Sequence, residues 1–272
     1  MAIIPGMTVP APEPLRRRYG LFDAAIGPLD LPTHGQGGGV RYVPNGCGSV
    51  RALGIDCYAP GAAPSKPIDG DDEEIESGVF AVLGTMECTL VGYSQTELEN
   101  KALRRLESGE MAAVETALWS GLDFEGNDLG IRNLDETAVP IPSGYEDGLI
   151  TEVVGALERY AYTEQQYGGV AYIHAPIEVA AFAAEAGLVL AEQGSTRKIT
   201  PLGSVWAFGA YPAGEIIVTG QTTVWRGVGV DMATAFDRIT NLELIVAERP
   251  YAVSFDCFAG RATYDPLEVV SP

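Results

Sequence analysis

The chain has 272 residues, of which 46% are hydrophobic, and a formal net charge of −20. This length and composition are those of a globular protein with a full core, built as one elaborated domain or two small ones. Because an acidic surface repels DNA phosphates, the charge argues against a protein that reads DNA sequence. The 33 glycines and 18 prolines predict many turns and long loops rather than a compact helical bundle.

The cysteines and histidines do not form a metal-binding pattern. No CxxC pair occurs, and the residues concerned are scattered: Cys47, Cys57, Cys88, Cys257, His34 and His174. We therefore expect no zinc site, and cysteines that remain unpaired thiols in a reducing cytoplasm. The N-terminus lacks the features of a signal peptide, and the best apolar run, at 179–191, is too short to cross a bilayer. We expect a soluble cytoplasmic protein without membrane contact.

Residues 1–50 resemble an arm rather than a folded unit, because prolines are scattered through them. Such a segment becomes ordered only by lying on its own domain or on a neighbour. It contains the only basic cluster of the chain, Arg16, Arg17 and Arg18. One interpretation is that this cluster anchors the segment, either to nucleic acid or to an acidic neighbouring subunit. The other, simpler interpretation is that the arginines are solvated or paired within their own chain.

Two strands, at 50–59 and 79–92, are expected to form an extended hairpin with a long polar loop between them. The loop has six acidic residues from Asp69 to Glu76, including the consecutive Asp71, Asp72, Glu73 and Glu74. Their spacing does not match a calcium-binding loop, so no metal is expected. The acidic loop is either solvated or meets a basic patch on a partner, which makes these four residues candidates for contacts between subunits.

A long helix is expected from Ser94 to Gly121. Ser94 and Glu97 form a capping box, and Gly121 provides a stop. Apolar residues recur near helical spacing and predict one buried face: Leu98, Ala102, Leu103, Leu106, Ala113, Val114, Ala117 and Leu118. The pair Ser108 and Gly109 is a weak point at which the helix can bend. About 26 residues at 1.5 Å each span roughly 39 Å, so this helix is a strut.

The second half of the chain predicts an α+β domain followed by closing strands. After an irregular linker at 122–147, we expect helices at 149–162 and 176–192. Strands are expected at 170–174, 204–208, 215–219, 222–230, 242–248 and 252–264.

No catalytic motif stands out. His174 lies between a predicted strand and a predicted helix, where enzymes often hold a general base, but no GxSxG elbow accompanies it. A structural histidine is the simpler interpretation. No glycine loop matches a phosphate-binding pattern, so no nucleotide or other cofactor is expected. The lack of catalytic and cofactor-binding motifs favours a structural role over an enzymatic one.

Three segments resemble the major capsid proteins of tailed phages, in particular those of actinobacterial phages. These proteins share the Hong Kong 97-type fold, which is also found in encapsulin nanocompartments. The segments are ELENKALRRLESGEMAAVETALWSG at 97–121, similar to the end of the spine helix; TPLGSVWAFGAYP at 200–212, similar to a recurring small-domain segment; and LIVAERPYAVSFDCFAGRATY at 244–264, similar to the closing strand. The order of the predicted elements over the whole chain matches as well.

The resemblance implies an α+β Hong Kong 97-type capsid fold. It would comprise an N-terminal arm (1–50), an extended β-hairpin loop (51–92), a spine helix with the first part of the peripheral domain (93–147), an axial domain (148–225) and the closing strands of the peripheral domain (226–272). The implied function is that of a structural subunit of a bacteriophage head, self-assembling as hexamers and pentamers into an icosahedral shell around double-stranded DNA. The implied location is the virion, assembled in the host cytoplasm.

The resemblance also implies partners. The main implied partners are other copies of the chain. A separate scaffold is implied as well, because the sequence begins at the arm without a fused helical leader, and a portal or decoration protein is a further implied partner. Packaged DNA would make only weak, non-specific contact with so acidic a shell. Some members of the family cross-link a loop lysine to a distant asparagine, here Lys66 and Asn241, but an exposed loop lysine is the simpler interpretation.

Three other functions stay open. An encapsulin-like compartment shell would need a cargo-docking helix that this proline-rich arm does not suit. A cytosolic α+β enzyme would use His174 and be a monomer or small oligomer. Phage tail-tube and head-decoration proteins seldom carry so long a helix.

Overall fold

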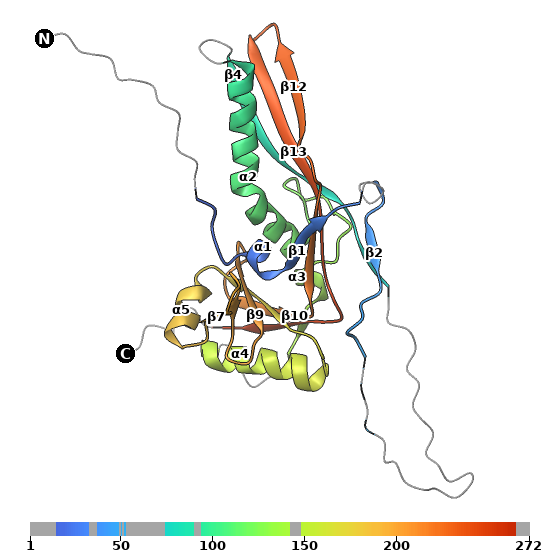
Figure 1. Cartoon of the computed structure of the whole chain (residues 1–272), viewed down its shortest axis with the longest axis vertical. Helices are drawn as coiled ribbons and strands as arrows, with labels where there is room; N and C mark the ends of the chain where they lie inside the picture. The colour runs from blue at the N-terminus through green and yellow to red at the C-terminus, as the bar shows by residue number, and fades with distance from the viewer. Residues whose placement is uncertain are drawn as a thin grey trace, which may run out of the picture.

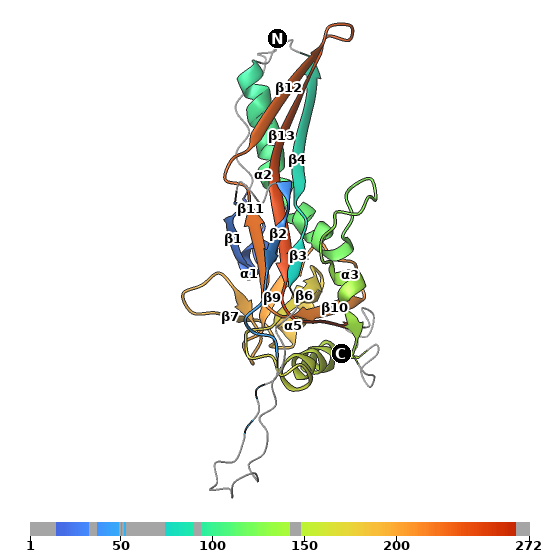
Figure 2. The ribbon, with the colours of Figure 1, turned by 90° about the vertical axis from the view of Figure 1, so that its right-hand side faces the viewer.

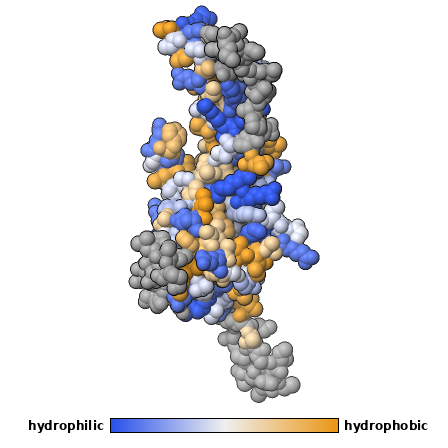
Figure 3. All heavy atoms as spheres, turned by 90° about the vertical axis from the view of Figure 1, so that its left-hand side faces the viewer, coloured by the Kyte–Doolittle hydropathy of each residue, from blue (hydrophilic) through white to orange (hydrophobic). Residues whose placement is uncertain are grey.

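The computed structural model describes residues 15–32, 37–48, 50, 52, 74–89, 94–141 and 148–264. In this part of the chain, a long helix and a narrow sheet rise from a broader base made of a second sheet and shorter helices (Figure 1). Apolar and hydrophilic side chains alternate over the face in Figure 3, with strongly hydrophilic ones gathered at mid-height. None of the described helices is long and apolar enough to cross a membrane.

The long helix forms where the sequence predicts it. Helix α2 (Gln95–Ser120) begins at Ser94, whose side chain accepts from the backbone of Glu97 while Glu97 reaches back to the backbone of Ser94. It ends at Gly121, which has a left-handed backbone with φ of 70° that costs glycine little. The helix continues without interruption through Ser108 and Gly109. The capping box and the stop are therefore both confirmed.

Helix α2 lies on a five-stranded sheet, whose strands are seen next to one another in Figure 2. The strands are β1 (Ile26–Asp30), β11 (Thr222–Arg226), β13 (Leu242–Phe255) and β12 (Asp231–Asp237) in that order, with β4 (Phe80–Thr89) paired to β13 as well. Gly84 of β4 allows the close approach, because a Cβ there would lie 2.5 Å from the backbone nitrogen of Leu106.

The expected break between strands 242–248 and 252–264 is wrong. Strand β13 runs through Pro250, because the proline sits where its missing N–H is not needed. On one side Pro250 pairs with Ala81 of β4. On the other side β11 ends opposite Tyr251 and β12 begins opposite Glu248, so Pro250 falls in the gap between two partner strands.

The base of the molecule is a seven-stranded sheet. Its strands in order are β5 (Val139–Pro140), β14 (Ala259–Thr263), β10 (Glu215–Thr219), β6 (Tyr172–Pro176), β9 (Val205–Gly209), β8 (Lys198–Ile199) and β7 (Leu190–Ala191). The sheet packs against α4 (Ile150–Arg159), its π-helical extension η2 (Tyr160–Glu164) and α5 (Val179–Glu185). Helix α5 is shorter than the expected 176–192, since the chain turns at Gly187 with φ of 72° and continues into β7.

The described part of the N-terminal segment lies on the body of its own chain. Helix α1 (Leu21–Ala24) places Leu21 and Phe22 in the core, where the Phe22 ring stacks on Tyr251 with ring centres 5.8 Å apart. Strand β1 then pairs in parallel with β11 at the edge of the five-stranded sheet.

The described strand pair next to the expected hairpin loop is short. Strand β2 (Val40–Tyr42) pairs with β3 (Ile75–Ser77). Helix α3 (Leu134–Thr137) follows α2. Most of the expected strand at 50–59 and the loop after it lie outside the described residues.

Candidate functional site

Two of the three clustered arginines hold the N-terminal segment against α2. Arg16 lies 2.9 Å from Glu110, and Arg17 lies 2.5 Å from Glu115. Arg17 also donates to the carbonyl oxygen of Phe208, in the base sheet, at 2.7 Å. The intrachain-paired interpretation therefore describes Arg16 and Arg17 in the single chain. Arg18 is exposed.

Glu115 is a buried carboxylate that joins three parts of the chain. Its side chain is fully buried. One oxygen accepts from the backbone nitrogen of Leu21 at 3.0 Å, and the other accepts from that of Ala210 at 2.8 Å. Burial raises the pKa of Glu115, against the effect of these donors and of Arg17. Glu115 therefore ties α2 to the N-terminal segment and to the base sheet.

Glu110 is the second buried carboxylate of α2. Its side chain accepts hydrogen bonds from Arg249 and from the hydroxyl of Tyr251, both at 2.6 Å, in addition to the one from Arg16. Arg226 lies 3.7 Å away. Burial raises the pKa of Tyr251, so its hydroxyl stays protonated and can donate.

The sequence held a signal for Glu110 that the prediction of the buried face missed. A strict spacing of four residues runs through Leu98, Ala102, Leu106, Glu110, Val114 and Leu118, and all six are buried. Ala113, expected on this face, is exposed. Glu115 lies on a second such series, between the buried Met111 and Trp119.

The remaining candidate contact residues are only partly described. Glu74 lies 3.7 Å from Arg41, which also pairs with Glu76 across the β2–β3 ladder. Lys66, Asp71, Asp72 and Glu73 lie outside the described residues. Asn241 is exposed next to β13 with a left-handed φ of 57°. The contacts of this loop with other subunits stay a prediction.

The expectation of unpaired cysteines is wrong for two of the four. Cys47 and Cys257 form a disulfide, with their Cα atoms 5.3 Å apart. They are 210 residues apart in the sequence, so only the fold brings them together. Cys88 is free, and Cys57 lies outside the described residues.

His174 does not have the surroundings of a general base. It is fully buried on β6. Its Nδ1 lies 3.2 Å from the hydroxyl of Tyr211, and its Nε2 lies 3.1 Å and 3.2 Å from the hydroxyls of Thr219 and Thr222. Burial lowers the pKa of His174 to about 3, so the ring is neutral. With both nitrogens hydrogen-bonded inside the protein, the residue is structural. Within the described ranges, no group of three or more potential metal ligands occurs.

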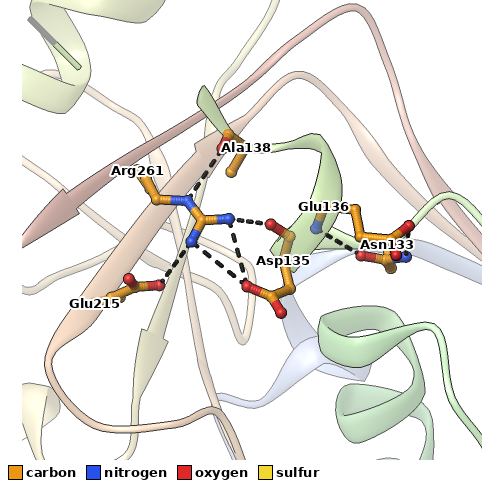
Figure 4. Close-up of polar contacts among 6 residues, drawn as sticks. All are labelled: Asn133, Asp135, Glu136, Ala138, Glu215 and Arg261. Carbon is orange, nitrogen blue, oxygen red and sulfur yellow. Dashed lines mark hydrogen bonds and ion pairs between the residues drawn. The ribbon is translucent and has the colours of Figure 1, made fainter. Parts of the chain in front are cut away.

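Arg261 links the base sheet to α3 (Figure 4). Its Nε donates to the carbonyl oxygen of Ala138 at 3.0 Å, and its terminal nitrogens contact Glu215 and the carbonyl and carboxylate of Asp135. This arginine fixes the segment after α2 to strands β14 and β10.

The arrangement of a long helix on a narrow sheet, above a base sheet with short helices, matches solved structures over nearly its full length. A chain from the capsid of an empty GTA particle has a TM-score of 0.60 at 11% identity, covering 96% of this chain and 95% of that one. The capsid of Ralstonia phage GP4 gives a TM-score of 0.56 at 9% identity, with 97% and 96% covered. A chain of Mycobacterium phage Ogopogo gives 0.55 at 12% identity, with 96% and 97% covered.

This chain has the Hong Kong 97-type capsid fold. The fold expected from the three resembling segments is thereby confirmed. No protein-family model matches the sequence, and no curated protein matches it either. In the terms of the Hong Kong 97-type fold, α2 is the spine helix. Its two buried carboxylates face different neighbours, since Glu110 contacts β13 and Glu115 contacts the N-terminal segment and the residue after β9.

Proposed function

We propose that this chain is the major capsid protein of a tailed bacteriophage, and that its copies assemble into an icosahedral head around double-stranded DNA. The observation that carries the proposal is the end-to-end similarity to a chain of the GTA particle capsid, which takes in 96% of this chain. The similarity is therefore not confined to one domain. The role is structural rather than catalytic.

The two sheets correspond to the two proposed domains. The five-stranded sheet with α2 is the peripheral domain, and the seven-stranded sheet with α4 and α5 is the axial domain. Strands β5 and β14 add 139–140 and 259–263 to the axial unit proposed at 148–225. Each domain has a hydrophobic core of its own.

Copies of the chain are the main proposed partners, arranged as hexamers and pentamers. Large interfaces spread over many copies give a stable shell even where each contact is weak. A separate scaffold, a portal and a decoration protein are further proposed partners. With a net charge of −20, contact with packaged DNA is weak and non-specific. The proposed location is the virion, after assembly in the host cytoplasm.

The test is to express the full chain alone and to examine it by mass photometry and negative-stain electron microscopy. Closed polyhedral shells, tubes or hexameric sheets are the expected result. A shell that consistently encloses a co-purifying enzyme would instead identify a cargo compartment. A chain that stays monomeric alone and with candidate scaffold proteins would contradict the proposal.

A further inference from the structure

A pocket of about 600 Å³ lies where residues 15–17, the middle of α2 and the strands β11 and β13 meet. Five arginines line it: Arg16, Arg17, Arg104, Arg226 and Arg249. The whole chain has 17 basic and 37 acidic residues, so this pocket concentrates positive charge on a strongly acidic protein. Such a concentration needs an explanation, because like charges placed together repel one another.

The carboxylates of the pocket do not neutralise its arginines. Arg17 is balanced by Glu115. Arg16, Arg226 and Arg249 all share the one carboxylate of Glu110, at 2.9, 3.7 and 2.6 Å. One negative charge therefore faces three positive charges.

Two arginines also have hydrogen-bonding capacity to spare. The Nε of Arg249 is buried and has no hydrogen-bond partner among the described atoms. Arg104 is exposed at the rim and makes no ion pair with a described residue, although Glu107 lines the same pocket. Because an unpartnered buried donor costs free energy, the pocket is suited to an anion that supplies several acceptor oxygens.

We propose that the pocket binds an acidic peptide segment, residues 69–73, of a second copy of the chain. This inference rests on the proposed function, since it requires neighbouring copies. The segment DGDDE carries four carboxylates and no basic residue. The next two acids, Glu74 and Glu76, already pair with Arg41. Arginine suits such a partner, because its planar group can bind a carboxylate through two parallel hydrogen bonds.

Other occupants fit less well. Residues 1–14, which precede the pocket in the sequence, contain one carboxylate, Glu13, against the four of 69–73. Within one chain, β2 lies on one side of the molecule, and the segment leading into α1 lies on the other side of α2 (Figure 1). Glu74 lies on the same side as β2, because it contacts Arg41 of that strand. The five residues 69–73 directly precede Glu74 and span at most about 18 Å when fully extended, which limits how far this segment can reach towards the pocket of its own chain. A nucleic-acid strand longer than the pocket would meet the acidic surface around it.

The experiment measures peptide binding to the full chain before assembly. A fluorescent peptide covering residues 67–75 is titrated with the wild-type chain, and fluorescence anisotropy is recorded. The matched control peptide has Asn and Gln in place of the acids. We expect the acidic peptide to bind, the neutral peptide not to bind, and the complex to weaken as salt is added.

Variants locate the binding. The double variant Arg104→Ala, Arg226→Ala leaves Glu110 paired with Arg16 and Arg249, so we expect it to fold. It should bind the peptide about tenfold more weakly, the factor that corresponds to roughly 1.4 kcal/mol. Arg105→Ala removes the same charge from the next position of α2, which does not line the pocket, and should bind like the wild-type chain.

Several results would overturn the inference. They are equal binding of the neutral peptide, equal binding by the double variant, or displacement of the peptide by an equal concentration of inorganic phosphate or a short oligonucleotide. Binding that appears only after the chain's own acids at 69–73 are changed to amides would show that the segment occupies its own pocket. Shells without peptide binding would overturn this inference and keep the proposed function. Peptide binding by a chain that never forms shells would contradict the proposed function, and with it the contact between neighbouring copies.

Discussion

Buried charges on α2 decide how the N-terminal segment is held. The fully buried side chain of Glu115 accepts three hydrogen bonds, from Arg17 and from the backbone of Leu21 and Ala210. A buried carboxylate is tolerated only where such partners replace water. Glu115 thus joins three segments: the spine helix α2, the N-terminal segment and the residues that follow β9.

Removing this junction should be costly. We expect Glu115→Ala to lower the free energy of unfolding by about 3–5 kcal/mol, because it leaves the backbone N–H groups of Leu21 and Ala210 without acceptors and removes the ion pair with the partly buried Arg17. Glu107→Ala, an exposed position of the same helix, should change it by less than about 0.5 kcal/mol. Urea denaturation of the unassembled chain measures both. Similar values for the two variants would contradict the role given to Glu115.

His174 predicts a defined pH dependence. Its pKa is about 3 in the folded chain and 6.5 in the unfolded chain, so between these pH values the unfolded chain binds a proton that the folded chain does not bind. Stability linked to this group is complete above the unfolded pKa and is lost as the pH falls towards 3, by about 1.4 kcal/mol for each pH unit.

The linked loss can be isolated with His174→Gln, which lacks the titrating group. This variant should be less stable than the wild-type chain near neutral pH, because its hydrogen bonds to Tyr211 and Thr219 are disturbed. The difference between the two should shrink as the pH falls from about 6.5 to about 4.5. Parallel stability curves from urea denaturation would show that His174 is not buried in its neutral form.

At the scale of elements, the contact between α2 and β4 depends on a missing side chain. A Cβ on Gly84 would meet backbone atoms of Ala102 and Leu106 at 2.7 and 2.5 Å. Backbone cannot move away as the end of a flexible side chain can, so the helix and the strand must separate.

Two glycine substitutions should therefore act in opposite directions. We expect Gly84→Ala to lower the free energy of unfolding by about 1–3 kcal/mol, the usual cost of an overfilled core. Gly109→Ala, at an open position of α2 with nothing within 4 Å of the added atom, should raise it by about 0.5–1 kcal/mol through helix propensity. Thermal and urea denaturation of both variants measure whether the free energy of unfolding rises or falls. A tolerated Gly84→Ala would mean that α2 lies farther from β4.

At the scale of the whole molecule, the disulfide closes a loop over most of the chain. Cys47 follows β2, and Cys257 lies between β13 and β14, so the bond ties the N-terminal part to the closing strands. Linking residues 210 positions apart restricts the unfolded chain strongly.

Loss of this bond should be measurable. We expect Cys47→Ser to reduce the free energy of unfolding by about 2–4 kcal/mol under oxidising conditions and to have little effect once a reductant is present. Cys88→Ser, at the free cysteine, keeps the disulfide, so its free energy of unfolding should stay close to that of the wild-type chain both with and without the reductant. The number of thiols labelled in denaturant should rise by two when the wild-type chain is reduced. No rise would show that Cys47 and Cys257 are thiols.

Local patterns were enough to predict where the long helix begins and ends. The capping box at Ser94, the stop at Gly121 and the apolar spacing along α2 depend on residues within a few positions of one another, so they can be recognised without knowing the fold. The resembling segments then pointed to the Hong Kong 97-type fold as a whole. Helix α5 was overextended, because its alanine-rich continuation is compatible with a helix and only the turn at Gly187 ends it.

Tertiary structure alone decided what joins distant parts of the chain. By itself the sequence determined the acidic charge, the arm rich in proline and the long helix, since each is a local or additive property. The Cys47–Cys257 bond and the pairing of Arg16 and Arg17 with buried carboxylates join residues that are 94 to 210 positions apart in the sequence. The passage of β13 through Pro250 depends on which strands flank that residue. Such contacts are set by the packing of the two sheets, and no spacing within the sequence encodes them directly.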